Sequence, residues 1–87
     1  MYEKMATIKN QIGLCARPAT FLIQKANEYK SSIWVEKDER RVNAKSLLGV
    51  LSLGVAQGDS VNIIADGFDE VAAVNSLCTL IGSDFEE

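Results

Sequence analysis

The residue that most constrains the fold is Pro18, the only proline among 87 residues. Its ring presets φ for a first helical turn, and the N–H that it lacks is one that such a turn does not use. Behind it, apolar residues recur at helical spacing, namely Ala19, Leu22, Ile23, Ala26 and Tyr29. This pattern predicts a helix that begins near residues 16–18 and runs to about Tyr29. Gly13 permits a tight bend just before it.

Cys15 lies immediately ahead of this predicted helix start. Unpaired backbone N–H groups and the positive end of the helix dipole favour an anion at such a position. Arg17 can reach the same point with a forked cationic donor, although a cation in the first turn opposes the helix dipole. The sequence therefore predicts a site for a thiolate or a phosphoryl group at Cys15 and Arg17.

The remaining segments alternate between strand and helix patterns. Alternating apolar residues predict strands over residues 2–8, 33–36, 40–44 and 61–65, with a tight turn at residues 38–39 between the second and third. Ser46 is a favoured N-cap for a short helix over residues 47–53. Asp69 is expected to cap a last helix, and Gly82 to close it as the C′ residue. The expected apolar stripe of this helix is Val71, Val74, Leu77, Cys78 and Ile81.

The resulting order, β-α-β-β-α-β-α, predicts an α+β fold. We expect an open-faced β-sandwich in which a four-stranded, mostly antiparallel sheet carries helices on one face. No linker or internal repeat divides the chain, so residues 1–87 are expected to form a single domain.

Composition excludes several classes of function. A net charge of −3 without a basic run argues against nucleic acid as a direct partner. No apolar run approaches the roughly 20 residues that span a bilayer, and no export signal precedes the first strand. Two cysteines fit a reducing cytoplasm. The chain has no histidine, no paired carboxylates and no glycine-rich phosphate loop, so we expect no metal, no cofactor and no catalytic turnover of its own.

Two segments carry a family resemblance. Residues 13–20, GLCARPAT, resemble the signature Gly-[Leu/Ile]-His-[Ala/Thr]-Arg-Pro-Ala of HPr, the phosphocarrier family of the bacterial phosphoenolpyruvate-dependent sugar phosphotransferase system. Residues 45–54, KSLLGVLSLG, look like the regulatory-serine region of HPr proteins from Gram-positive-type bacteria. The resemblance runs nearly end to end and implies the HPr-like open-faced sandwich in a cytoplasmic protein. One departure is central: the phosphoryl-accepting histidine of the family falls on Cys15, as in the Crh-like branch, which also lacks it.

Four interpretations of Cys15 remain open. It is a small residue in the place of a lost histidine, a thiolate that accepts phosphate from enzyme I, a redox-sensitive thiol, or a cysteine engineered into an ordinary HPr. The resemblance gives Arg17 the role of assisting the phosphoryl group. Ile12 stands where many relatives carry a small polar residue, which removes a polar contact to that group.

Ser46 has both a structural and a regulatory interpretation. As an N-cap it contributes about 1 kcal/mol to its helix. The resemblance implies that it is the site phosphorylated by HPr kinase/phosphorylase. A phosphate is electrostatically tolerated at a helix start, so the modification is compatible with the helix. The resemblance therefore implies a regulatory protein of carbon catabolite control rather than an enzyme.

The short helix after Ser46 is too apolar to bury all of its side chains, because they span more than one face. Exposed apolar residues beside Ser46 would mark a docking surface. The resemblance implies as partners the kinase and a transcriptional regulator, with enzyme I and enzyme IIA in the carrier alternative. The residues expected to contact partners are Arg17, Thr20, Lys45, Leu47, Leu48 and Leu51, with Arg17 and Lys45 as a basic rim.

Overall fold

The computed structural model describes residues 1–85 and contains the seven predicted elements in the predicted order. The strands are β1 (Tyr2–Thr7), β2 (Ser32–Lys37), β3 (Arg40–Asn43) and β4 (Ser60–Asp66). The helices are α1 (Arg17–Ala26), α2 (Leu47–Ser52) and α3 (Glu70–Gly82).

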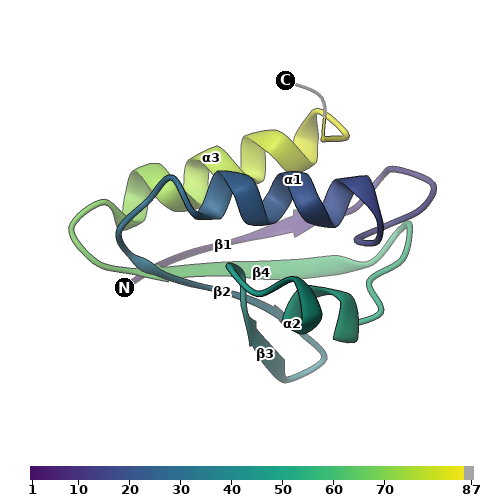
Figure 1. Ribbon diagram of the computed structural model, residues 1–87, viewed down its shortest axis with the longest axis horizontal. Coiled ribbons are helices and arrows are strands. Elements are labelled where there is room, and N and C mark those ends of the chain that lie inside the picture. The colour runs from purple at the N-terminus through teal and green to yellow at the C-terminus, as the bar shows by residue number, and fades with distance from the viewer. Residues whose placement is uncertain (86–87) are drawn as a thin grey trace.

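The four strands form one antiparallel sheet in the order β1-β4-β2-β3. Helices α1 and α3 lie side by side over one face of it, and α2 lies beside β3 and the N-terminal half of α1 (Figure 1). The fold is therefore the predicted α+β open-faced sandwich. Asp38 and Glu39 both have positive φ, and Lys37 pairs with Arg40. The β2–β3 connection is thus a two-residue hairpin loop with the left-handed backbone typical of type I′ turns.

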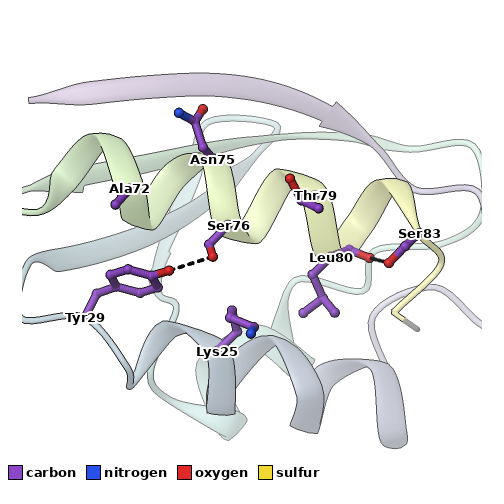
Figure 2. Close-up of a pocket in the computed structure, with 8 residues that line it drawn as sticks. All are labelled: Lys25, Tyr29, Ala72, Asn75, Ser76, Thr79, Leu80 and Ser83. Atoms are coloured by element: carbon purple, nitrogen blue, oxygen red, sulfur yellow. Dashed lines mark hydrogen bonds between the residues drawn. The ribbon is translucent and has the colours of Figure 1, made fainter. Parts of the chain in front are cut away.

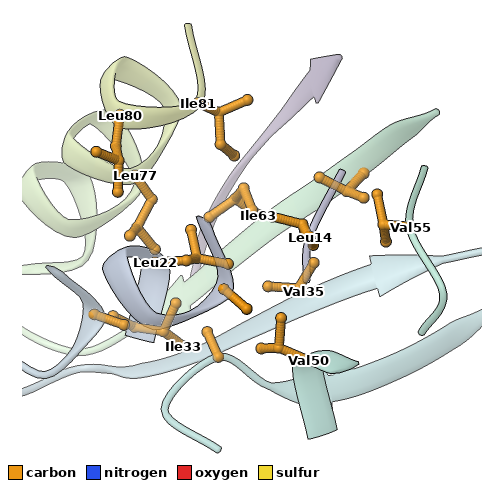
Figure 3. Close-up of a cluster of buried hydrophobic side chains, with 14 of the residues drawn as sticks. Leu14, Leu22, Ile33, Val35, Val50, Val55, Ile63, Leu77, Leu80 and Ile81 are labelled. Atoms are coloured by element: carbon orange, nitrogen blue, oxygen red, sulfur yellow. The ribbon is translucent and has the colours of Figure 1, made fainter. Parts of the chain in front are cut away.

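The main core lies between the sheet and the two long helices. Alternate residues of the central strands point into it, including Ile33 and Val35 from β2 and Ile63 from β4, and Leu22 and Leu77 meet them from the helices (Figure 3). All five side chains are almost completely buried. This burial of apolar surface is the dominant stabilising term of the fold.

Helix α1 ends earlier than predicted. The apolar pattern suggested a helix to about Tyr29, but α1 ends at Ala26, and the N–H of Tyr29 bonds the carbonyl of Ala26 in a turn. Tyr29 still packs against the core from this turn. A side chain can therefore continue an apolar stripe after the backbone has left the helix.

Both predicted ends of α3 need correction. Asp69 holds the N-cap position, but its carboxylate bonds the backbone N–H groups of Lys30 and Ser31 instead of its own helix. Gly82 remains inside the helix, and the left-handed residues that follow are Asp84 and Phe85.

The apolar stripe of α3 is also shifted relative to the prediction. Val71 is exposed and Cys78 is half-buried, whereas Ala73 and Leu80 are buried with Val74, Leu77 and Ile81. Burial raises the pKa of the Cys78 thiol. Nearly every residue in this helix is apolar or small, so the sequence pattern predicts poorly which of its faces is buried.

Candidate functional site

The segment before α1 is anchored by its own backbone. Gly13 has φ of 67°, and a Cβ there would collide with the carbonyl oxygen of Val55. The N–H of Leu14 donates to that same oxygen at 3.0 Å, while the Asn10 side chain donates to the carbonyl of Gly13 at 2.9 Å. Leu14 is buried and Cys15 is exposed. The close approach of the segment at residues 13–14 to the backbone of Val55 therefore fixes the position of Cys15 at the surface.

Ala16 is the N-cap of α1 and has an unusual backbone, with φ of 55° and ψ of −128°. Residues with a Cβ rarely adopt this conformation, which costs of the order of 1–3 kcal/mol. No side chain caps the first turn of α1. Its leading N–H groups are therefore open to an anion from outside the chain. No sequence pattern predicts this conformation, because alanine has no preference for a positive φ.

The groups expected to handle a phosphoryl group surround this helix start. The Cys15 thiol donates to the carbonyl of Ile12 at 2.9 Å. The Arg17 guanidinium lies over the ring of Phe21, with 5.4 Å between its central carbon and the ring centroid. Among residues 1–85, no carboxylate forms an ion pair with Arg17. Thr20 is exposed and its hydroxyl donates to the carbonyl of Ala16 at 3.3 Å.

Ser46 is the N-cap of α2, as predicted. It has an extended backbone, and its Oγ accepts the N–H of Gly49 at 3.1 Å. The residue is half-buried. A Cβ on Gly49 would lie 3.3 Å from this Oγ and 3.4 Å from the Cβ of Val42. Because Gly49 has no Cβ, its backbone can approach Ser46 and Val42 closely enough for the capping hydrogen bond.

Three leucines of α2 point away from the core. The exposed fraction is 80% for Leu48, 46% for Leu47 and 39% for Leu51, whereas Val50 and Leu53 are buried. The prediction that this helix leaves apolar surface exposed is confirmed. We call Leu47, Leu48 and Leu51 the α2 apolar face. An exposed apolar cluster of this kind is typical of a docking surface.

Lys45 does not stand at the edge of the α2 apolar face as a free cation. Its ammonium donates to the carbonyls of Tyr29 at 2.8 Å and Ser31 at 2.9 Å, in the turn between α1 and β2. The basic rim expected from the sequence therefore lacks Lys45, whose ammonium is bonded within the fold.

The α1–α2 region brings most of the predicted residues together. Helices α1 and α2 pack against each other, and the loop after α2 supplies the Val55 carbonyl that anchors the segment before α1. A separate groove of about 560 Å³ lies between α1 and α3 and contains none of the predicted site residues (Figure 2). Across it, the Tyr29 hydroxyl donates to Ser76.

Residues 1–85 contain no cluster of three or more side chains that could hold a metal ion. None of the helices in that part of the chain combines the length and apolar character needed to cross a bilayer.

Comparison with known proteins gives a consistent family. Residues 2–83 match the family model described as the PTS HPr component phosphorylation site. The chain is 42% identical to the HPr-like protein Crh of Halalkalibacterium halodurans over 93% of its own length and 96% of that protein. It is 38% identical to the phosphocarrier protein HPr of Neisseria meningitidis, over all of this chain and 98% of that one.

A solved structure agrees. The crystal structure of HPr-C-His from Thermoanaerobacter tengcongensis has a TM-score of 0.96 and 51% identity to this chain, and the match covers 100% of this chain and 99% of that one. With the family model, the curated relatives and the fold in agreement, the chain belongs to the HPr family of phosphocarrier proteins of the sugar phosphotransferase system.

Proposed function

We propose that the chain acts mainly as a regulatory protein that HPr kinase/phosphorylase phosphorylates at Ser46, in carbon catabolite control in the cytoplasm. One observation carries this proposal. The Ser46 hydroxyl stands at the start of α2 beside the three exposed leucines of the α2 apolar face, in a chain that has no histidine to carry phosphate.

Phosphorylation would change this surface without removing its helix. A phosphoserine carries about −1.5 to −2 charges and three acceptor oxygens. The Gly49 N–H, 3.1 Å from the Ser46 Oγ, would remain within reach of a phosphate oxygen, and the positive end of the helix tolerates the charge. The surface would then combine a dianion with apolar side chains.

Such a surface suits a protein partner that offers an apolar pocket and arginine side chains. We assign this role to a transcriptional regulator of carbon catabolite control, in keeping with the similarity to the HPr-like protein Crh. Leu48 is the first residue of the α2 apolar face to test, because its side chain is the most exposed of the three.

The direct test is incubation with HPr kinase/phosphorylase and ATP, followed by intact-protein mass spectrometry. We expect wild type to gain the mass of one phosphate and Ser46→Ala to gain none. Leu48→Ala is the companion variant, which should keep the acceptor serine but weaken docking of the modified protein. If wild type stays unmodified under conditions in which an HPr with the same serine is phosphorylated, the proposal fails.

The second candidate is a phosphocarrier that works through Cys15, with enzyme I as donor and enzyme IIA as acceptor. The exposed thiol at an uncapped helix start, beside an Arg17 without an ion pair among residues 1–85, favours it. In the transfer, sulfur attacks the phosphorus of a phosphohistidine, so that an S–P bond forms and an N–P bond breaks. The imidazole nitrogen keeps the electron pair, and the thiol proton passes to it or to water.

Incubation with enzyme I and phosphoenolpyruvate separates the two candidates. The regulatory function predicts no change of mass. A gain of one phosphate in wild type, absent in Cys15→Ser, would establish the carrier. Alkylation of Cys15 at neutral pH no faster than that of a model thiol would argue against an activated thiolate, and with it against a redox sensor.

A further inference from the structure

A second group of cations, separate from Arg17, lies in a pocket of about 180 Å³ at the start of β2. The first three residues of β2 form part of its wall, and Asn43 at the end of β3 forms another part. Lys30, Ser31 and Lys45 complete its lining. The proposed phosphorylation of Ser46 does not use this pocket.

The acceptors near the pocket are already occupied. The carbonyls of Tyr29 and Ser31 accept two hydrogens of the Lys45 ammonium. The side-chain oxygen of Asn43 accepts the backbone N–H of Lys45 at 2.8 Å. The Asp69 carboxylate accepts the backbone N–H groups of Lys30 and Ser31 and the hydroxyl of Ser31. A neutral or cationic ligand would therefore find few free acceptors.

Donors in the same pocket are unused. Within residues 1–85, the Lys30 ammonium, the Ser32 hydroxyl and the Asn43 amide N–H groups have no acceptor. Lys45 has one ammonium hydrogen beyond the two that it donates to carbonyls. The pocket thus presents several donors and two positive charges to whatever enters it.

Within residues 1–85, neither the Lys30 nor the Lys45 ammonium forms an ion pair. The carbonyl partners of Lys45 are uncharged, and Lys45 is half-buried, where salt screens a charge less than at an open surface. Asp66 lies 3.8 Å from the N-terminal amine, and Glu36 lies 3.6 Å from Arg41. Asp69 is the acid bonded to the pocket wall, but it accepts backbone N–H groups and the Ser31 hydroxyl rather than either ammonium. An anion would satisfy both the donors and the charge.

We propose that this pocket binds a phosphate group, either as the free ion or as the monoester of a small metabolite. Two ammonium groups match the charge of about −1.5 to −2 on such a group, and its terminal oxygens match several converging donors. Water occupies about 30 Å³ in the liquid, so a volume of about 180 Å³ accommodates a phosphate group with a short carbon chain.

The chain carries its own reporter for this site. Trp34 lines the pocket and is the only tryptophan. We would titrate the full-length, unmodified protein with inorganic phosphate, with glycerol phosphate and with sodium chloride at matched ionic strength. Tryptophan fluorescence and amide chemical shifts would be followed. We expect a saturable response to a phosphate form, with shifts at Ser32, Asn43 and Lys45. The tighter ligand of the two identifies the source of the phosphate.

Charge-removing variants test the assignment. Lys45→Gln should weaken binding about tenfold, because it removes a charge-assisted hydrogen bond. Lys30→Gln removes a more exposed cation, leaves the carbonyl contacts of Lys45 intact, and should weaken binding about two- to fivefold. Lys9→Gln, which removes the same charge from an exposed residue outside this pocket, is the matched control. Equal affinity in all three variants, or a response that sodium chloride reproduces, would overturn the proposal.

Discussion

The starts of α1 and α2 are built in opposite ways. Helix α2 begins with Ser46, whose own hydroxyl accepts the N–H of Gly49. Helix α1 begins with Ala16, which has no side-chain acceptor and has a positive φ. The Ser46 side chain therefore satisfies one of the first N–H groups of α2, whereas no side-chain cap does so at the start of α1. Two helices of one small fold thus begin in different ways.

The start of α3 extends this comparison. Asp69 occupies the N-cap position, but its carboxylate accepts hydrogen bonds from the turn between α1 and β2. Together with Lys45, which donates to two carbonyls of the same turn, it holds that turn from both sides. A capping residue type therefore indicates a helix start but not the hydrogen bond that its side chain makes.

The largest change in unfolding free energy is expected from Gly13→Ala. This variant tests how much the contact between Gly13 and the Val55 backbone, just before the start of α1, stabilises the fold. The new Cβ would collide with the Val55 backbone at a φ of 67°. We expect a loss of about 3 kcal/mol of unfolding free energy, measured by urea denaturation. Gly54→Ala is the matched control, because Gly54 has a similar φ of 62° but open space around it, and it should lose only about 1 kcal/mol. Equal losses would mean that the close approach to Val55 contributes nothing.

Ser46→Ala tests the self-capped start. It removes the acceptor for the Gly49 N–H and should lower the unfolding free energy by about 1 kcal/mol. Ser46→Asp keeps an acceptor at the same position and should stay within about 0.5 kcal/mol of wild type. If Ser46→Ala is as stable as wild type, the cap does not stabilise α2.

Ala16→Gly should act in the opposite direction. Glycine adopts the backbone of Ala16, with φ of 55° and ψ of −128°, without a Cβ clash, and this gain exceeds the entropy that glycine adds to the unfolded chain. We expect about 1 kcal/mol of stabilisation in the same urea assay. Ala72→Gly, at an exposed position inside α3, should lose about 1 kcal/mol. A loss in both variants would argue against strain at Ala16.

The smallest expected effect is on the stability of the protein in acid, through the carboxylates at the start of α3. Hydrogen bonds from the Ser31 hydroxyl and from the Lys30 N–H hold the pKa of Asp69 below its ordinary value of 3.8. The Gly67 N–H and the N-terminal amine lower the pKa of Glu70 from 4.5. In acid, these two carboxylates bind protons more readily in the unfolded chain than in the folded one. Their contribution to the free energy of unfolding is therefore complete above the ordinary pKa values and is lost as the pH falls through the lower folded values.

Asp69→Asn should therefore unfold with a shallower dependence on pH below about 4, measured by urea denaturation at a series of acid pH values. Asp66→Asn is the companion variant, because that carboxylate lies 3.8 Å from the N-terminal amine without a bond to the turn. An unchanged slope in Asp69→Asn would show that the turn does not lower the pKa of this carboxyl.

Much of this molecule follows from local patterns. The seven elements, the antiparallel sheet, the cap at Ser46 and the exposed leucines of α2 were all predicted. They were predictable because strand alternation, a single proline and a serine before an apolar run each act over a few residues. The errors at Tyr29, Asp69 and Gly82 are of another kind, since each depends on which neighbour the fold brings close.

The sequence by itself determined the order of elements, the family and the two helix starts that carry Cys15 and Ser46, because these depend on short-range preferences and on recognisable motifs. Only the tertiary structure decided that Ala16 has a positive φ, that Gly13 meets the Val55 backbone, and that Lys45 turns toward the carbonyls of residues 29 and 31. Contacts between segments far apart in the chain set these features, and no local pattern records them.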